Sequence, residues 1–236
     1  MHGYWTDVGA PAGVDWCEPD YSWTPWVAEP WNTASSLVIA ALGVWGFWQL
    51  RGAPLRFRMG MLGTCGVGLG SAAFHGTLLR VAQAADELPM LWLGLGCAWT
   101  MSARGVRWQA RARLAVVLAT FGTLFTVAYA GVPWAFSLFI GVYALIVAWL
   151  AVRTTQLSLA DPRLGRWARL VVGAYVGSFA AFWLPEHVLL PCDHPLQGLQ
   201  LHSLWHVGAG IGTWAYWRWA AEGGRAGPER DPLPRD

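Results

Sequence analysis

The sequence contains no lysine, so its sixteen basic residues other than histidine are all arginines. Charged residues make up only 13% of the 236 residues, about half of the ~25% that is usual in soluble domains. A basic stretch followed by a short apolar core is missing at the N-terminus, so we expect no cleavable signal peptide. The shortage of charge indicates that lipid is the solvent for most of the chain.

Hydrophobic residues make up 55% of the chain and gather in long runs. The runs are close to the ~20 residues that a helix needs to cross a bilayer: 31–49, 59–79, 87–103, 114–130, 132–152, 168–189 and 200–219. They predict an all-α membrane protein, a seven-transmembrane helix bundle covering residues 31–219. An acidic, Trp-rich segment precedes the bundle at residues 1–30, and a disordered cytoplasmic tail is expected at 220–236.

The arginines predict the orientation, because basic residues concentrate on the cytoplasmic side of membrane proteins. With the N-terminus outside, fifteen of the sixteen arginines fall on the inner side, and only Arg80 falls outside. We therefore expect a multi-pass protein with its C-terminus in the cytoplasm. The all-Arg, Trp- and Ala-rich composition favours a bacterial source and its inner membrane; in a eukaryote the membrane would be that of the endoplasmic reticulum or Golgi.

Two histidines near the end of the chain, His202 and His206, are four residues apart. On a helix such residues share a face and lie about 6 Å apart, close enough to bind one metal ion. His75 is predicted at the same membrane depth on another span and adds a third imidazole. Three protein ligands with an open position are typical of catalytic zinc. Three histidines that only pack between helices fit the pattern as well.

Ser71 lies one helical turn before His75, and Asp86 follows near the start of the next apolar run. A carboxylate beside zinc can accept the proton of a water molecule, and a serine hydroxyl can donate a hydrogen bond to an oxyanion. These residues favour a hydrolase. Two structural interpretations stay open: Asp86 and Glu87 at a helix N-terminus, and Ser71 as a small residue that permits close helix packing.

Three blocks of sequence, at residues 14–33, 70–90 and 201–207, contain VDWCEPDY with AEPWNT, GSAAFH with DELPM, and LHSLWHV. On these blocks the chain resembles the alkaline ceramidases, a family of seven-span intramembrane zinc amidases. The resemblance implies that zinc binds to His75, His202 and His206. It also implies that Asp86 is the general acid and base, and that Ser71 is a hydrogen-bonding partner at the site.

Four carboxylates gather ahead of the first arginine: Asp15, Glu18, Asp20 and Glu29. Oxygen-only ligands favour a hard cation such as calcium, although the spacing is not that of an EF-hand. A solvated acidic segment fits the composition equally well. The family resemblance implies a calcium site at these positions, together with the backbone carbonyl of Trp16. Asp20 stands where the family often has asparagine, which adds a negative charge.

Cys17 and Cys192 both fall outside the membrane in this topology, where disulfides persist. The resemblance implies that they pair, whereas Cys65 and Cys97 within the spans are expected to be buried thiols. Five tryptophans near the N-terminus are expected at the membrane interface: Trp5, Trp16, Trp23, Trp26 and Trp31. Stacking on carbohydrate is the alternative for these rings.

The resemblance implies hydrolysis of ceramide to a sphingoid long-chain base and a free fatty acid, with catalytic zinc, structural or regulatory calcium, and the site toward the outer side. Two alternatives remain: a zinc hydrolase of another lipid amide or ester, and a non-enzymatic, receptor-like seven-span protein that contains zinc. A cation channel would need polar residues along its whole path, and the inner halves of the spans have almost none. The expected partners are ceramide and the bilayer, without nucleic acid or a protein partner.

Overall fold

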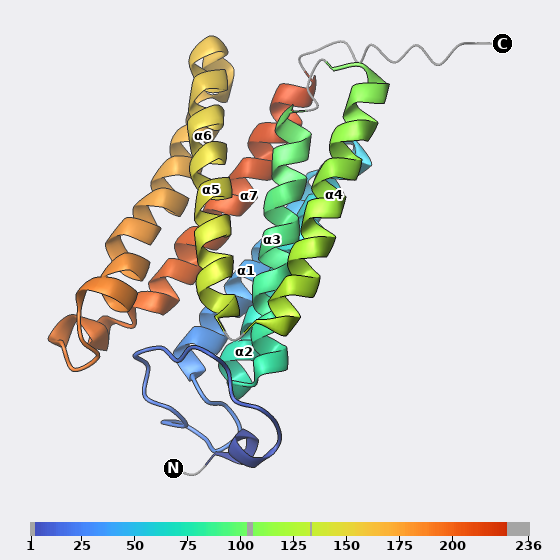
Figure 1. Ribbon diagram of the computed structural model, residues 1–236. Coiled ribbons are helices and arrows are strands. Elements are labelled where there is room, and N and C mark those ends of the chain that lie inside the picture. The colour runs from blue at the N-terminus through green and yellow to red at the C-terminus, as the bar shows by residue number, and fades with distance from the viewer. Residues whose placement is uncertain (1–2, 103–105, 133, 226–236) are drawn as a thin grey trace.

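Seven long helical segments run side by side in this computed structural model, which describes residues 3–102, 106–132 and 134–225 (Figure 1). Six are single helices: α1 (Pro30–Gln49), α2 (Leu55–Thr77), α3 (Arg80–Ser102), α4 (Trp108–Gly131), α5 (Ala135–Ala160) and α7 (Leu201–Arg225). Across these ranges the structure has isolated β-bridges but no strand. The predicted all-α fold is therefore confirmed.

The remaining segment, called the sixth segment below, runs from Pro162 to Leu189 without interruption. It consists of a 3₁₀ turn (Pro162–Leu164), α6 (Gly165–Val171) and three π-helical turns (Val172–Val176, Phe179–Trp183 and Pro185–Leu189). Two further 3₁₀ turns lie outside the long helices, at Tyr4–Asp7 and Pro195–Leu199. π turns are rare and often occur at functional sites, and this segment borders the cavity described below.

Among the described residues, α4, α5 and the sixth segment are long and apolar enough to cross a membrane. Few of their side chains are buried, as expected of helices that face lipid. In the view of Figure 1, α4 and α6 stand at the two sides, with α1, α3 and α7 between them. Among the described residues, most of the buried polar side chains belong to α1, α2, α3 and α7.

Two glycines of α2 allow its neighbours to approach closely. A Cβ atom on Gly68 would lie 2.3 Å from the backbone nitrogen of Ala40 in α1, and one on Gly70 would lie 2.0 Å from the backbone oxygen of Ala85 in α3. Neither position therefore tolerates a larger residue without a shift of a helix. The contact at Gly70 places the next residue of α2 beside Asp86, which is how the two halves of the predicted site meet.

The N-terminal segment folds against the end of the bundle where α2 passes into α3 (Figure 1). Leu78, the residue directly after α2, adopts a left-handed conformation with φ of 52° and turns the chain into α3. Backbone hydrogen bonds tie the segment to this turn: Ala12 N–H to Leu78 O, Ala28 N–H to Gly76 O, and Glu29 N–H to His75 O. The acidic residues are thereby held next to His75.

Two predicted boundaries are wrong. The expected tail begins at 220, but α7 continues to Arg225 because Ala220 and Ala221 are buried and the Glu222 carboxylate accepts the Trp167 indole N–H at 2.6 Å. Residues 226–236 of that tail lie outside the described residues. The helix expected from 87 begins at Arg80, so Asp86 lies inside α3 instead of capping it.

Candidate active site

Three histidine rings from two helices meet at one end of the bundle. His75 belongs to the last turn of α2, and His202 and His206 to the first turns of α7. The ring centroids are 5.1 Å apart for His75 and His202, 4.9 Å for His75 and His206, and 4.5 Å for His202 and His206. One ligand nitrogen of each lies within 4.8 Å of the others, and all three side chains are buried.

The surroundings of these rings fit a zinc ion. The Nδ1 atom of His75 forms a hydrogen bond with the Glu29 carboxylate, and that of His206 lies 2.9 Å from the Ser35 hydroxyl. The Nε2 atom of His75 is buried and has no hydrogen-bond partner among the described residues. An oxygen that holds Nδ1 leaves Nε2 for a metal, and an unpartnered buried nitrogen is costly. Three imidazoles with an orphaned nitrogen are therefore a suitable donor set for zinc.

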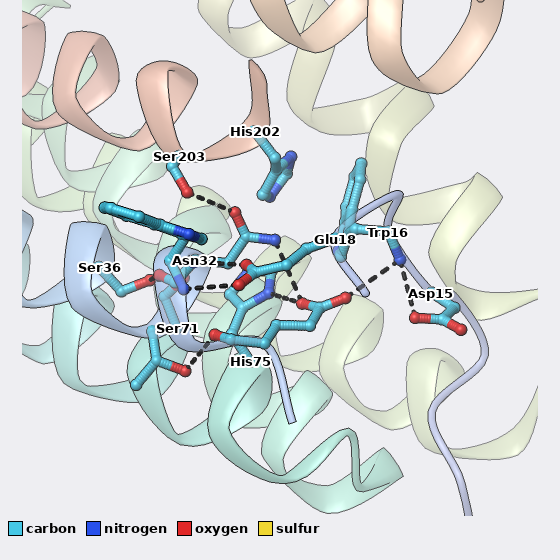
Figure 2. A network of polar contacts seen from close by, with 12 residues as sticks. Asp15, Trp16, Glu18, Asn32, Ser36, Ser71, His75, His202 and Ser203 are labelled. Atoms are coloured by element: carbon cyan, nitrogen blue, oxygen red, sulfur yellow. Dashed lines mark hydrogen bonds and ion pairs between the residues drawn. The ribbon is translucent and has the colours of Figure 1, made fainter. Parts of the chain in front are cut away.

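Ser71 and Asp86 lie beside the close contact at Gly70. The Ser71 hydroxyl accepts a hydrogen bond of 3.0 Å from Ser36 of α1 (Figure 2), and it is within hydrogen-bonding reach of Asp86. Asp86 is buried, and its Oδ1 atom has no hydrogen-bond partner in the described ranges. The close contact at Gly70 involves the residue before Ser71, so both interpretations of Ser71 remain predictions.

A cavity of about 360 Å³ opens beside the histidines. Ser71, Asp86, His202 and His206 contribute its polar wall. The remaining wall is mainly apolar and aromatic, and much of it comes from α5 and the sixth segment: Phe136, Phe139, Ile140, Phe179 and Trp183. An apolar cavity with reactive groups on one wall suits a lipid whose polar group is the part that reacts.

The acidic N-terminal residues only partly converge. Carboxylate oxygens of Asp15, Asp20 and Glu29 lie within 4.8 Å of one another. The Glu18 carboxylate instead accepts the backbone N–H groups of Trp31 and Asn32, at 2.7 and 2.8 Å (Figure 2), and so satisfies the N-terminus of α1. Glu18 keeps unused lone pairs, so this role is compatible with a cation nearby.

Burial and mutual repulsion change the acidity of these groups. Burial is the main cause that raises the pKa of Glu18 to about 7 and that of Glu29 to about 8. Loss of solvent around its carboxylate, together with the charges of Asp15 and Glu29, raises the pKa of Asp20 to about 6. A cation that binds among such carboxylates reduces the repulsion between their charges and favours their ionised forms. The cluster of Asp15, Asp20 and Glu29 therefore fits a calcium ion.

The structure contains the disulfide between Cys17 and Cys192, which joins the N-terminal segment to the loop before α7. Trp16, next to this bridge, is buried and stacks on His202 with ring centroids 3.7 Å apart. The prediction of Trp16 as an interfacial residue is therefore wrong, because its ring fills the space beside the histidines. Trp23, Trp26 and Trp31 remain exposed, as that prediction requires.

Two further histidines near the site have other partners. The His187 ring packs against Trp16 and Trp183, with centroids 5.0 and 4.8 Å apart. The His194 side chain accepts the backbone N–H of Leu196 and begins the short 3₁₀ turn after it. Neither belongs to the group of nitrogens that could share a metal with His75.

The sequence interpretation missed a polar network on α1. Asn32 accepts a hydrogen bond of 2.8 Å from Ser203 of α7 and donates one of 3.3 Å to Glu29. One turn later, the hydroxyls of Ser35 and Ser36 face Nδ1 of His206 at 2.9 and 3.3 Å (Figure 2 draws Asn32, Ser36 and Ser203). A cluster of small polar residues at the start of an apolar span is unusual, and that signal could have identified these positions.

Comparison with known proteins gives consistent matches. The sequence model of the Ceramidase family matches residues 10–222. Two putative alkaline ceramidases of Dictyostelium discoideum match: dcd3B is 25% identical over 90% of this chain and 86% of its own length, and dcd3A is 36% identical over 37% of each chain. Mouse alkaline ceramidase 3 is 39% identical over 38% of this chain and 34% of its own length. These relatives are eukaryotic, so the expected bacterial source finds no support. The chain belongs to the Ceramidase family, the alkaline ceramidases.

Proposed function

We propose that the chain is a membrane hydrolase that cleaves the amide bond of ceramide, releasing a long-chain base and a free fatty acid. The observation that carries this proposal is the position of three buried histidines, Ser71 and Asp86 together beside an apolar cavity. The family membership and the names of the relatives support the substrate class. The proposed setting is a seven-span bundle with its N-terminus and active site on the outer or lumenal side.

In this proposal, zinc is held by His75, His202 and His206. When bound, zinc supplies Lewis acidity toward the amide carbonyl and toward water. Glu29 holds Nδ1 of His75, and Ser35 holds Nδ1 of His206, so each ring presents its other nitrogen. These contacts orient the rings before substrate arrives.

Asp86 accepts the proton of the attacking water and passes it to the amine nitrogen as the C–N bond breaks. Its buried position, and an Oδ1 atom without a hydrogen-bond partner in the described part of the chain, suit a group that must exchange a proton inside the cavity. Ser71, within reach of Asp86, donates a hydrogen bond to the oxyanion that forms when water adds to the carbonyl. Ser36 keeps the Ser71 hydroxyl in place through the 3.0 Å hydrogen bond between them.

The apolar part of the cavity accommodates lipid chains. Its aromatic walls from α5 and the sixth segment exclude water from the hydrophobic part of the substrate. The sixth segment packs against α7 along the whole length of the segment. It packs against α5 mainly through its first turns. The cavity lies between α5 and the later turns of the sixth segment, and we propose that lipid enters there.

Calcium, in the same proposal, binds among Asp15, Asp20 and Glu29, with Glu18 and the Trp16 carbonyl as further ligands. The Cys17–Cys192 disulfide and the hydrogen bonds of Glu18 to α1 keep this segment against the bundle. Glu29 contacts both the acidic cluster and His75. In this proposal, calcium stabilises the N-terminal segment and, through Glu29, the position of the proposed zinc ligand His75.

Purified protein is expected to convert ceramide to free fatty acid at mildly alkaline pH with calcium. A zinc chelator should abolish this turnover and added zinc should restore it, because the proposed mechanism takes its Lewis acidity from zinc. Mass spectrometry of both products provides the measurement. A panel of other N-acyl lipids and lipid esters serves as the comparison. Protein that binds zinc and cleaves one of these lipids, but leaves ceramide intact, would contradict the substrate assignment.

Replacing Asp20 with asparagine is expected to weaken calcium binding by roughly one order of magnitude at pH 7, because one negative charge leaves the site. It should also flatten the pH dependence. With the pKa of Asp20 at about 6 and that of Glu18 at about 7, protons compete with calcium, so affinity in the unaltered protein falls as pH drops from 8 to 5. Calorimetric titration at several pH values measures both effects, and an unchanged affinity would argue against Asp20 as a ligand.

A further inference from the structure

The Glu186 carboxylate lies where three parts of the chain meet. Glu186 belongs to the last π turn of the sixth segment and is only 5% exposed. Its Oε1 atom accepts the backbone N–H of Cys17 at 3.2 Å, and its Oε2 atom lies 3.8 Å from Nδ1 of His202. One carboxylate thus contacts the N-terminal segment and faces the first turn of α7.

The two atoms that face each other across 3.8 Å are both buried and both lack a hydrogen-bond partner among the described residues. That distance exceeds a direct hydrogen bond, but two unpaired buried polar atoms favour closing it. Trp16 stacks on the face of the His202 ring, with centroids 3.7 Å apart, so the ring has little freedom to turn away. A small movement of the Glu186 side chain completes the contact.

We infer that Glu186 is a positioning residue for His202: its carboxylate accepts the Nδ1 proton and leaves Nε2 directed at the metal. This inference rests on the proposed zinc site. It completes a pattern in which each of the three rings has an oxygen beside Nδ1, from Glu29 for His75 and from Ser35 for His206. Carboxylate partners of this kind fix the tautomer and orientation of metal-binding histidines.

Replacing Glu186 with glutamine tests whether Glu186 orients the His202 ring or only connects the sixth segment to the N-terminal segment. The glutamine oxygen can still accept the Cys17 N–H, but its NH₂ group then faces Nδ1 of His202. This NH₂ group and an Nδ1–H group are both donors and cannot pair, so the His202 ring is driven to the tautomer with its proton on Nε2. A protonated Nε2 atom cannot bind the metal. Zinc affinity of the purified full-length protein, measured by chelator competition without lipid, should fall ~10–100-fold. The visible spectrum of the cobalt-substituted protein should change as well.

The matched control is Glu222→Gln. Glu222 is a partly exposed residue near the C-terminal end of α7, at the opposite end of the bundle, and its carboxylate accepts the Trp167 indole N–H. This variant should bind zinc like the unaltered protein. A second control, Cys17→Ser with Cys192→Ser, removes the disulfide between the N-terminal segment and the loop before α7. It leaves the Glu186 side chain and the backbone N–H of residue 17 unaltered. A glutamine variant with weakened zinc binding and an unchanged melting temperature of the metal-free protein supports the inference.

Two results would overturn it. One is a Glu186→Gln variant with the zinc affinity of the unaltered protein. The other is a variant in which zinc affinity and the metal-free melting temperature fall together, as in the double cysteine variant, because Glu186 would then only tie segments together. Unaltered protein that binds no zinc overturns the inference together with the metal assignment. Failure to cleave ceramide, by contrast, affects the proposed substrate and leaves this measurement standing.

Discussion

Replacing Asp86 with asparagine is expected to reduce the turnover number for ceramide by ~10²–10⁴-fold, the usual contribution of general acid–base catalysis. Asparagine has nearly the same shape, so the packing of α3 against α2 at Gly70 should survive. It cannot accept a proton from water at neutral pH, and this is the step assigned to Asp86. The histidines are untouched, so the zinc content should stay the same. Steady-state kinetics and metal analysis on one preparation measure both quantities.

This variant also separates an enzyme from a receptor-like protein, because a purely structural zinc site has no need of a buried base beside it. Asp161→Asn is the matched control: that carboxylate pairs with Arg163 at the start of the sixth segment, away from the cavity. It should retain full turnover. An Asp86→Asn variant that turns over ceramide at the unaltered rate would remove Asp86 from the mechanism.

Replacing Glu29 with glutamine is expected to weaken both proposed metal sites at once. Glu29 is fully buried and shares its carboxylate between the acidic cluster, the Trp16 backbone N–H and Nδ1 of His75. Loss of its charge removes a calcium ligand, and its NH₂ group would oppose the His75 N–H. Zinc affinity should therefore fall ~10–100-fold, and calcium affinity by roughly one order of magnitude. Competition with chelators for each metal measures the two losses.

Asp15→Asn is the control for this double effect. It removes the same charge from the acidic cluster but leaves the bond between Glu29 and His75 in place. It should weaken calcium binding and leave zinc affinity unchanged when calcium is saturating. If Glu29→Gln behaved like Asp15→Asn, the two sites would not be connected through Glu29. If zinc affinity rose with calcium in the unaltered protein, linkage between the sites would follow directly.

Several features followed from the sequence because they depend on local patterns. Apolar runs of helical length predict helices wherever they occur, and their order matches α1 to α7. The four-residue spacing of His202 and His206 places both rings on one helical face by geometry alone. The pairing of Cys17 with Cys192, the substrate class and the family membership came through the resemblance, not through spacing. The seven crossings and the orientation remain predictions.

Other features depend on contacts between distant segments, and only the tertiary structure decided them. The apolar run that begins at residue 87 placed Asp86 near a helix start, but the turn at Leu78 lets α3 begin at Arg80, so Asp86 lies inside the helix. Trp16 was expected at the membrane interface because it is one of five tryptophans near the N-terminus. The neighbouring disulfide and the stacked His202 ring keep it buried instead.

The oxygens beside the histidine rings are the clearest case. Spacing alone identified two imidazoles, His202 and His206, because they share one helix and periodicity is a local property. His75 was added because the predicted topology places it at the same membrane depth. The oxygens nearest their Nδ1 atoms belong to Glu29, Ser35 and Glu186, which come from the segment before α1, from α1 itself and from the sixth segment. No sequence period relates these positions, since their proximity arises only when the N-terminal segment, α1 and α7 pack together. The sequence by itself identified the histidines proposed to bind a metal, and the tertiary structure decided which oxygen atoms lie beside their rings.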